Sequence, residues 1–261
     1  MDLNGKNIVI TGASSGIGEA TLRELLTYDV NIIAANRNVA NAPVSDSKVK
    51  WFQCDISDPS QIDKLFEFAI EQFGHIDIFI ANAGFAYYEV MQQEDWGRLE
   101  AIVKTNFVSP VYSAVKMARL NQGREYTFVF TASAMAHLPI PGYSTYAATK
   151  AAIDKFAYAY RIENNDQGHL LVVYPIATRT DFFNRAGNNT PVPWPSQPAD
   201  VVGKAIVNGI EKNRKKVYPS KLFILMLFVN RFLPFSLDIY AQVEAFKLRR
   251  WLRKQTQSHQ V

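Results

Sequence analysis

The sequence has few of the residues that form disulfides or bind metals. Its 261 residues include one cysteine and four histidines. A single cysteine excludes an internal disulfide and is typical of a reducing compartment. The scattered histidines and Cys54 offer no metal-ligand cluster, so we expect no metal site. We expect Cys54 to end a buried strand as a small apolar side chain.

The N-terminal residues 1–6 lack the charged start, apolar stretch and cleavage site of a secretory signal. We therefore expect a cytoplasmic protein. The net charge is only +4, and it is unevenly placed. Residues 211–255 hold eleven Lys or Arg against three acidic residues, a net of +8, which leaves about −4 for the rest of the chain. A basic end on an acidic body argues against a general nucleic-acid-binding surface, and we expect no nucleic-acid partner.

Short apolar runs alternate with helical patterns along most of the chain. The runs that predict strands cover residues 7–11, 31–35, 49–54, 76–81, 126–131 and 169–174, with a short edge strand at 216–218. The patterns that predict helices cover residues 17–27, 59–73, 96–120, 146–164 and 198–212, with Ser57 or Asp58 as a cap ahead of Pro59. This alternation predicts an α/β fold with a doubly wound parallel sheet, a Rossmann fold. We expect one domain over residues 1–219, with an apolar helical extension over residues 220–261.

Three glycines lie between the first predicted strand and the first predicted helix. Glycines at such a turn let backbone amides approach a pyrophosphate, whose charge meets the positive end of the helix. The spacing here is G-x-x-x-G-x-G rather than the commonest dinucleotide pattern, G-x-G-x-x-G. We predict that this loop binds a dinucleotide through Gly12, Ser14, Ser15, Gly16, Ile17 and Gly18. The alternative is a glycine turn with no ligand.

The end of the second predicted strand lacks a carboxylate. An acidic residue at this point would accept hydrogen bonds from the ribose hydroxyls of NAD, whereas an arginine can pair with the 2′-phosphate of NADP. The chain has Asn36 and Arg37 there. We predict NADP(H) as the coenzyme, with NAD(H) less favoured. The alternative is that Arg37 is an ordinary solvated surface residue.

Tyr146 and Lys150 lie one helical turn apart on the same face of a predicted helix, and Ser133 precedes them. A free tyrosine has a pKa of about 10. The charge of Lys150, with that of an oxidised nicotinamide, is expected to lower the pKa of Tyr146, which then acts as general acid or base. Ser133 is expected to hydrogen-bond the substrate oxygen. The alternative is that these are ordinary helix-surface and strand-end residues.

Several separate motifs, in the correct order over residues 6–184, resemble the compact single-domain branch of the short-chain dehydrogenase/reductase family. Thr11–Gly18 looks like its coenzyme loop. The remaining matches are Asp55, the Asn82-Ala83-Gly84 motif, the tetrad Asn106, Ser133, Tyr146 and Lys150, and the segment Pro175 to Thr180, which includes Thr178. Two positions depart from the family pattern, because Ile176 and His137 stand where glycines are common.

The resemblance implies further roles for these residues. Asp55 would contact the adenine ring, and Thr180 the carboxamide end of the coenzyme. Lys150 would hold the nicotinamide ribose, and Asn106 a water that links the lysine to solvent. Ile176 would either crowd the nicotinamide pocket or alter the loop. A homodimer or homotetramer is also expected from the resemblance.

Aromatic and aliphatic residues are expected around the substrate. Their positions relative to the motifs single out Phe85, Tyr87, His137, Leu138, Tyr143, Phe182, Phe183 and Trp194. Such a wall favours an apolar ketone or secondary alcohol, lipid-like or steroid-like. We expect His137 to be a pocket-wall or loop residue rather than a second catalyst. The longest irregular stretch, residues 185–197, lies where a substrate lid is expected.

The C-terminal extension contains eight apolar residues in a row, at 222–229. This run is too short for a spanning helix, which needs about 20 predominantly apolar residues. Basic residues precede and follow it, which favours peripheral contact with an anionic membrane through residues 220–254. The alternative is a helix that closes the substrate pocket or is buried in a dimer.

The motifs together predict an oxidoreductase that transfers a hydride between NADP(H) and an apolar ketone or secondary alcohol. One alternative is a coenzyme-binding regulator without catalysis, which the complete tetrad speaks against. Another is an NAD-dependent reductase of a small carbonyl. An epimerase or dehydratase is a third, but such enzymes typically need a larger substrate domain.

Overall fold

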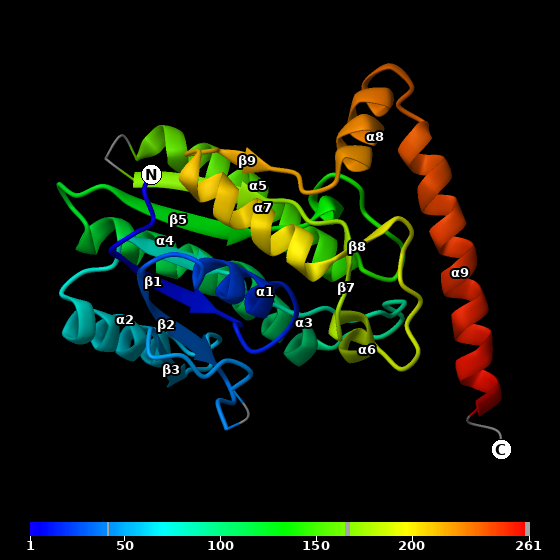
Figure 1. The fold of residues 1–261 in the computed structure, drawn as a ribbon. Helices are drawn as coiled ribbons and strands as arrows, with labels where there is room; N and C mark the ends of the chain where they lie inside the picture. The colour runs from blue at the N-terminus through cyan, green and yellow to red at the C-terminus, as the bar shows by residue number, and fades with distance from the viewer. Residues whose placement is uncertain (41, 165–167, 259–261) are drawn as a thin grey trace.

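The computed structural model describes residues 1–40, 42–164 and 168–258. Its centre is a parallel sheet of seven strands in the order β3-β2-β1-β4-β5-β6-β9 (Figure 1). These strands are β1 (Lys6–Thr11), β2 (Val30–Asn36), β3 (Val49–Gln53), β4 (Ile78–Ala81), β5 (Tyr126–Thr131), β6 (Gly168–Val173) and β9 (Lys216–Val217). The short strands β7 (Ala177–Arg179) and β8 (Ser196–Pro198) form a separate pair. The predicted doubly wound α/β fold is therefore confirmed.

Helices cover both faces of the sheet. Those of the body are α1 (Gly16–Leu25), α2 (Pro59–Phe73), α3 (Trp96–Val103), α4 (Ser109–Leu120), α5 (Ser144–Glu163), α6 (Phe182–Ala186) and α7 (Ala199–Glu211). Two further helices, α8 (Lys221–Phe232) and α9 (Ser236–Ser258), follow the last strand. Of the predicted extension, residues 259–261 lie outside the described residues.

Alternating side chains of each strand enter two separate cores. On β1, Ile8 and Ile10 pack with α1 and α7, whereas Val9 packs with α2, α4 and α5 on the other face. Period-two alternation of this kind is what a sheet buried on both sides requires. The helices α1 and α7 lie so close that a Cβ on Gly203 would come within 2.7 Å of the Ala20 carbonyl carbon.

The single helix predicted over residues 96–120 is interrupted by a π-helical turn. This turn, η1 (Lys104–Val108), lies between α3 and α4. Pro110 has no N–H, so it cannot donate the bond that a regular α-helix would make to the carbonyl of Asn106. Most of the other predicted elements differ from the observed ones by one or two residues at an end, whereas 59–73 and 126–131 match. Asp58 is the cap of α2, and its carboxylate accepts from the Ser60 amide.

The helices α8 and α9 stand apart from the layered body at one end of the sheet (Figure 1). They are joined to the body through side chains, among them Phe223 and Leu237, which pack with Ala134 and Leu138. The described helices include none that is long and apolar enough to cross a membrane.

Candidate active site

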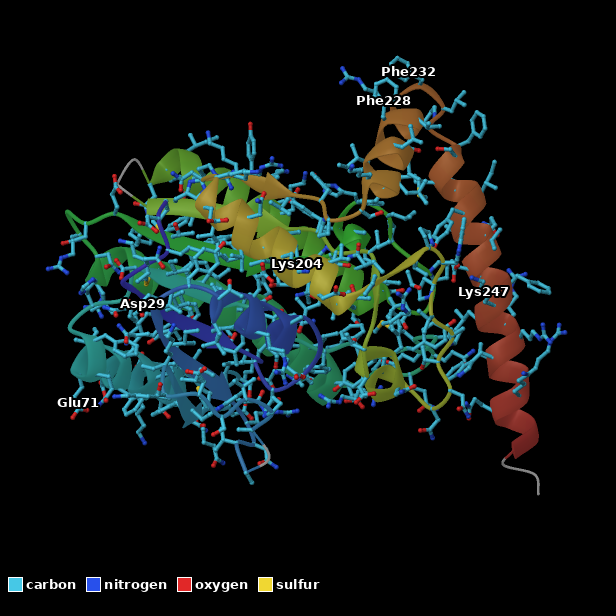
Figure 2. All side chains as sticks on the ribbon, in the orientation of Figure 1. Asp29, Glu71, Lys204, Phe228, Phe232 and Lys247 are labelled. Atoms are coloured by element: carbon cyan, nitrogen blue, oxygen red, sulfur yellow. The ribbon has the colours of Figure 1, made fainter. Side chains whose placement is uncertain are left out.

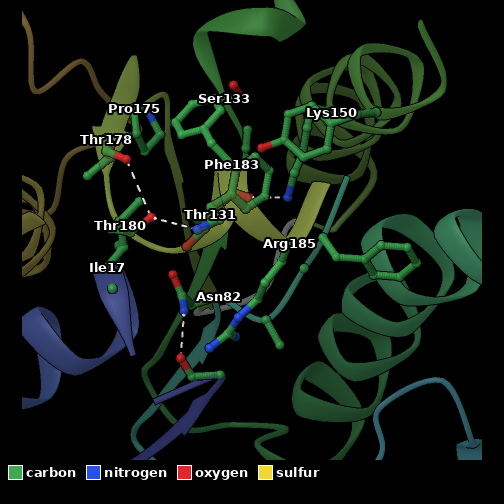
Figure 3. A pocket seen from close by; sticks show the side chains of 18 of the residues that line it. Ile17, Asn82, Thr131, Ser133, Lys150, Pro175, Thr178, Thr180, Phe183 and Arg185 are labelled. Atoms are coloured by element: carbon green, nitrogen blue, oxygen red, sulfur yellow. Dashed lines mark hydrogen bonds between the residues drawn. The ribbon is translucent and has the colours of Figure 1, made fainter. Parts of the chain in front are cut away.

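The carboxyl ends of the strands open onto one cavity of ≈ 1200 Å³ (Figure 3). It extends from Arg37, after β2, past the glycine loop to Tyr146 on α5, and on to Tyr240 on α9. Because the strand order reverses between β1 and β4, the loops on either side of this point splay apart and leave a crevice. The cavity lies where open α/β sheets generally bind ligands.

Backbone geometry explains the glycines of the loop. Gly12 and Gly16 have φ values of +67° and +60°, which favour glycine. A Cβ on Gly12 would approach the Ala83 Cα to 2.8 Å, and one on Gly18 would come within 2.0 Å of the Gly12 carbonyl oxygen. Gly12, Gly16 and the loop residues Ser14, Ser15 and Ile17 line the cavity. Gly18 does not, because it is packed behind the loop, so its role in this structure is steric.

The start of α1 presents unused hydrogen-bond donors to the cavity. Ser15 is the cap residue, but its side chain makes no capping hydrogen bond. The first amides of a helix have no partner within the helix, and the helix dipole makes this end positive. An anion that binds between Gly12 and Ile17 would therefore meet several amides at once.

Asn82 fastens the glycine loop to the neighbouring strand. Its amide donates to the carbonyl oxygens of Thr11 and Gly12, at 3.3 and 3.2 Å. The Thr11 hydroxyl in turn accepts from the backbone amides of Asn82 and Ala83, both at 3.2 Å. Asn82, Ala83 and Gly84 line the cavity as predicted.

The distant end of the cavity is polar and lined by Arg37 and Asp55. Asp55 is held in a turn, because its carboxylate accepts from the amide and hydroxyl of Ser57 at 2.9 and 2.8 Å. Arg37 is exposed, and among the described residues it forms no ion pair. The cation beside this end of the cavity is thus available to a ligand.

Tyr146 and Ser133 both line the cavity and are hydrogen-bonded to each other. Burial raises the pKa of Tyr146 to about 12, and a hydrogen bond with Ser133 opposes part of this effect. Without a coenzyme the pKa of Tyr146 is thus raised, because burial is the largest effect. The expected lowering, which includes the charge of an oxidised nicotinamide, stays a prediction. The Ser133 oxygen accepts from the Met135 amide at 3.1 Å, which orients the hydroxyl.

Lys150 is buried one turn along α5, and burial lowers its pKa to about 8. Its ammonium donates to the Thr131 carbonyl oxygen at 2.7 Å (Figure 3). The same nitrogen lies 5.6 Å from the centre of the Tyr146 ring. The charge is therefore near the phenol, but its hydrogen bond is made to the end of β5.

Asn106 lies in the π-turn, is 1% exposed and is not among the residues that line the cavity. Its side chain bridges to Phe85, donating to the carbonyl oxygen at 2.8 Å and accepting from the amide at 3.1 Å. A Cβ on Gly84 would lie 3.0 Å from the Asn106 oxygen and 3.6 Å from the Lys150 nitrogen. Asn106 is thus placed behind Lys150 and fixes the loop after β4.

The segment after β6 closes the cavity beside the glycine loop. Pro175, Thr178 and Thr180 all line it, and a Cβ on Gly16 would meet the Thr180 side chain at 3.1 Å. The Pro175 carbonyl oxygen accepts from the Ala134 amide at 2.8 Å and so ties this segment to the turn after Ser133. Ile176 lines the cavity and also packs with the cluster of Phe223 and Leu237 from α8 and α9.

Five of the eight predicted substrate-wall residues line the cavity: Phe85, Tyr87, Leu138, Phe182 and Phe183. Three do not. His137 packs against the Tyr174 ring, with ring centres 4.9 Å apart. Tyr143 is fully buried behind Tyr146, and Trp194 is exposed on the lid segment. The placement of these three in the wall is wrong, because each turns toward the core or toward solvent.

Several cavity residues were not predicted. They are chiefly Met135, Ile140, Arg185, Phe223, Met226 and Tyr240. Arg185, near the end of α6, extends into the pocket (Figure 3). The last three belong to α8 and α9. The apolar run at 222–229 was the available signal, and the alternative of a helix that closes the pocket agrees with the inner side of α8.

Three features show that the residues present fit a dinucleotide. The glycine loop leaves no room for Cβ atoms beside uncapped helix amides. The cavity continues without a break from Arg37 to Tyr146. The buried Thr131 hydroxyl at the cavity edge has no partner among the described residues. An unpaired buried hydroxyl is costly, and a ligand would satisfy it.

In the described part of the chain, no group of three or more potential metal ligands lies together.

A family model described as short chain dehydrogenase matches residues 6–190. The chain belongs to the short chain dehydrogenase family. Among curated proteins, 11-beta-hydroxysteroid dehydrogenase 1A of Arabidopsis thaliana is 29% identical over 242 residues, which cover 83% of this chain and 68% of the relative. The chain is accordingly an NAD(P)-dependent oxidoreductase.

Solved structures share this fold at low sequence identity. A short chain dehydrogenase of Burkholderia cenocepacia J2315, in complex with NADP, has a TM-score of 0.80 at 19% identity, covering 92% of this chain and 99% of that one. A short chain dehydrogenase/reductase of Burkholderia phymatum, in complex with NAD, has a TM-score of 0.77 at 18% identity, covering 90% and 96%. Because the two carry different coenzymes, they leave the choice between NAD and NADP open.

Proposed function

We propose that the protein reduces an apolar ketone, or oxidises the corresponding secondary alcohol, with NADP(H). The observation that carries this proposal is the position of Tyr146. It lies beside Ser133 where the polar, amide-rich part of the cavity meets a wall of Phe182, Phe183 and Met226. A coenzyme on one side and an apolar substrate on the other would both reach this tyrosine.

In this mechanism the bound coenzyme supplies the hydride that the carbonyl carbon receives. Tyr146 donates a proton to the carbonyl oxygen, and a pKa of about 12 keeps it protonated at neutral pH. The Ser133 hydroxyl, oriented by the Met135 amide, donates to the same oxygen and stabilises its developing charge. With a pKa of about 8, Lys150 is mostly charged at pH 7, and its charge favours the phenolate that remains.

Positioning residues complete this arrangement. Lys150 is placed to hold the nicotinamide ribose, while the Thr131 carbonyl oxygen fixes its ammonium. Asn106 holds the loop at Phe85 against the helix that carries Lys150. The hydrogen bonds of Lys150 and Asn106 support a positioning role for each, and the resemblance to the family supports the contact of Lys150 with the ribose.

Arg37 supports NADP(H) over NAD(H). It is exposed at the end of β2, lines the cavity and forms no ion pair with the described residues. A guanidinium can bind the 2′-phosphate with charge-assisted hydrogen bonds, and a carboxylate that would repel the phosphate is absent from Asn36 to Asn38.

The apolar wall supports a bulky, lipid-like or steroid-like substrate. Besides the aromatic rings of α6, it includes Leu138, Ile140 and Met226. The name of the relative from Arabidopsis thaliana, a hydroxysteroid dehydrogenase, points to the same class of substrate. We also infer peripheral contact with a membrane, for which the exposed apolar residues of α8 and α9 are the support. A homodimer or homotetramer in the cytoplasm remains a prediction.

The test is consumption of NADPH and NADH by the purified chain across steroid, lipid, sugar and short-chain ketones. The expected result is turnover with NADPH and an apolar ketone, at a higher kcat/KM than with NADH. Turnover with sugar ketones alone would contradict the substrate class. Coenzyme binding without turnover on any ketone would instead favour a coenzyme-binding regulator.

A further inference from the structure

The helix α8 presents apolar side chains in two opposite directions. Phe223 and Met226 line the catalytic cavity, and Phe223 is almost completely buried. Phe228 and Phe232 are 60% and 67% exposed, and they lie at the end of α8 that is farthest from the sheet (Figure 2). Their rings contact each other, with centres 5.2 Å apart. One short helix therefore connects the inside of the cavity with an exposed aromatic tip.

The long helix α9 has the same division. Tyr240 lines the cavity and donates to the Trp194 carbonyl oxygen at 2.8 Å, while Trp251 donates to the Asn188 carbonyl oxygen at 2.9 Å. These bonds fix the inner side of α9 to the lid segment. On the outer side, Ile239, Val243 and Phe246 are more than half exposed at helical spacing. Packing against the described residues does not explain the exposed apolar side chains of α8 or of α9.

Exposed apolar residues are concentrated on α8, on α9 and on the turn between them. Between residues 222 and 246, eleven large apolar side chains are exposed. Single exposed apolar residues are normal on a soluble protein, but a large contiguous patch marks an interaction site. We call the exposed apolar side chains Leu225, Phe228, Phe232, Ile239, Val243 and Phe246 the tail patch.

The net charge of the residues around the tail patch favours one kind of partner. Residues 221–254 contain seven Lys or Arg against Asp238 and Glu244, a net of +5. Two copies that met through this surface would bring like charges together, which is unfavourable. An anionic bilayer offers the opposite charge together with an apolar layer for the aromatic tip. On the outer side of α9, exposed Arg250 and Arg253 follow the apolar residues and would face lipid headgroups.

We propose that the tail patch docks on an anionic membrane surface and that the substrate is a ketone or secondary alcohol dissolved in that membrane. The second half of this statement rests on the proposed oxidoreductase function. A lipid would pass from the bilayer along the helix pair to Phe223, Met226 and Tyr240 at the substrate end of the cavity. The helices that contact the membrane are thus the helices that line the path to Tyr146.

The docking is tested by sedimentation of the full chain with vesicles of phosphatidylcholine, with and without phosphatidylserine. The chain is expected to bind the vesicles that contain phosphatidylserine, and less tightly as salt is raised. Phe228→Glu with Phe232→Glu should weaken binding by about 100-fold, because burying each ring contributes about tenfold. The control is Trp96→Glu, which changes an aromatic residue that is 80% exposed on α3, outside the tail patch, and should leave binding unchanged.

Three results would overturn the docking. They are no binding of the natural chain to phosphatidylserine vesicles, unchanged binding of the double variant, or equal losses for the double variant and for Trp96→Glu. Gel filtration tests the competing possibility that a second copy of the chain covers the tail patch. If the natural chain is an oligomer that the double variant breaks, without any binding to vesicles, a second copy covers the tail patch.

The delivery of substrate is tested by activity of the same variants. The double variant should lose at least about tenfold in rate on an apolar ketone dissolved in vesicles and keep its rate on a short, water-soluble ketone. Equal rates of natural chain and double variant on both ketones would contradict delivery from the membrane. If the natural chain reduces neither ketone, the proposed function is wrong, whereas docking is decided separately by sedimentation.

Discussion

The two ends of the cavity are built from different kinds of contact. At the coenzyme end, the contacts are made chiefly by backbone atoms. The Thr11 and Gly12 carbonyl oxygens accept from Asn82, and glycines occupy positions where a Cβ atom would collide with neighbouring atoms. At the substrate end, side chains of α8 and α9, chiefly Phe223 and Met226, form the wall. A backbone cradle tolerates little change, whereas a side-chain wall can be altered without moving the reacting groups. Substitutions at the two ends should therefore have separable effects.

The largest effect is expected where the two ends meet, at Tyr146. Tyr146→Phe removes the proton donor but keeps the ring, so kcat should fall by about 10²- to 10⁴-fold with every substrate. Coenzyme binding, followed by titration of protein fluorescence, should be unchanged. The control is Tyr158→Phe, which alters an exposed tyrosine on the same helix. Retained turnover of Tyr146→Phe would remove this residue from the mechanism.

Lys150 should impose a cost on folding that depends on pH. Burial lowers its pKa from 10.5 to about 8, so the unfolded chain binds a proton more tightly than the folded one between these values. Stability then rises with pH from about 8 to about 10.5, and the full cost, at most about 3 kcal/mol, applies below pH 8. Lys150→Met should be inactive yet more resistant to urea at pH 7, with the difference shrinking toward pH 10.

The matched control for this prediction is Lys204→Met, on the exposed side of α7. Its resistance to urea should not differ from that of the natural chain at either pH. A Lys150→Met variant that is less stable than the natural chain at pH 7 would show that the hydrogen bond to the Thr131 carbonyl oxygen outweighs the cost of burial.

At the coenzyme end, Arg37→Ala should discriminate between the two coenzymes. Loss of charge-assisted hydrogen bonds to the 2′-phosphate should raise the KM for NADPH by about 10- to 100-fold. The KM for NADH should stay within about twofold, because NADH has no phosphate at that position. Steady-state kinetics with both coenzymes on one ketone provide the comparison, and equal changes in the two KM values would contradict the preference for NADP(H).

At the substrate end, Met226→Ala should have the smallest and most selective effect. Shortening this side chain should lower kcat/KM for a bulky apolar ketone by up to about tenfold and leave a short ketone unaffected. Leu225→Ala, the neighbouring residue that is turned outward, is the control in the absence of vesicles. If Met226→Ala also raised the KM for NADPH, the effects of substitutions at the two ends of the cavity would not be separable.

The sequence predicted the coenzyme end more completely than the substrate end. Strands and helices of the body follow apolar periodicity, and two of them, Pro59–Phe73 and Tyr126–Thr131, match the structure at both ends. Glycines, Asn82 and Arg37 could be placed because their positions are fixed relative to the strands. The π-turn at Asn106 was not predicted from apolar periodicity, since it spans only five residues inside a long helical pattern.

The remaining errors concern properties that depend on tertiary packing. Burial, which raises the pKa of Tyr146 in the chain without coenzyme, depends on residues far away in sequence, so the charges of Lys150 and of an oxidised nicotinamide could not predict it. His137 and Trp194 were assigned to the substrate wall by distance along the chain, which says nothing about which way a loop side chain turns. The C-terminal run was visibly apolar, but only its packing distinguishes Phe223, inside the cavity, from Phe228 outside it.

The central claim is that the chain uses NADPH to reduce an apolar ketone through Tyr146. The most direct measurement follows both reactants at once, with the purified chain, NADPH and a steroid or long-chain ketone. We predict that one molecule of secondary alcohol forms for each NADPH consumed, and that neither change occurs with Tyr146→Phe. NADPH that binds without being consumed by any apolar ketone, or alcohol formed equally well by the natural chain and by Tyr146→Phe, would contradict it.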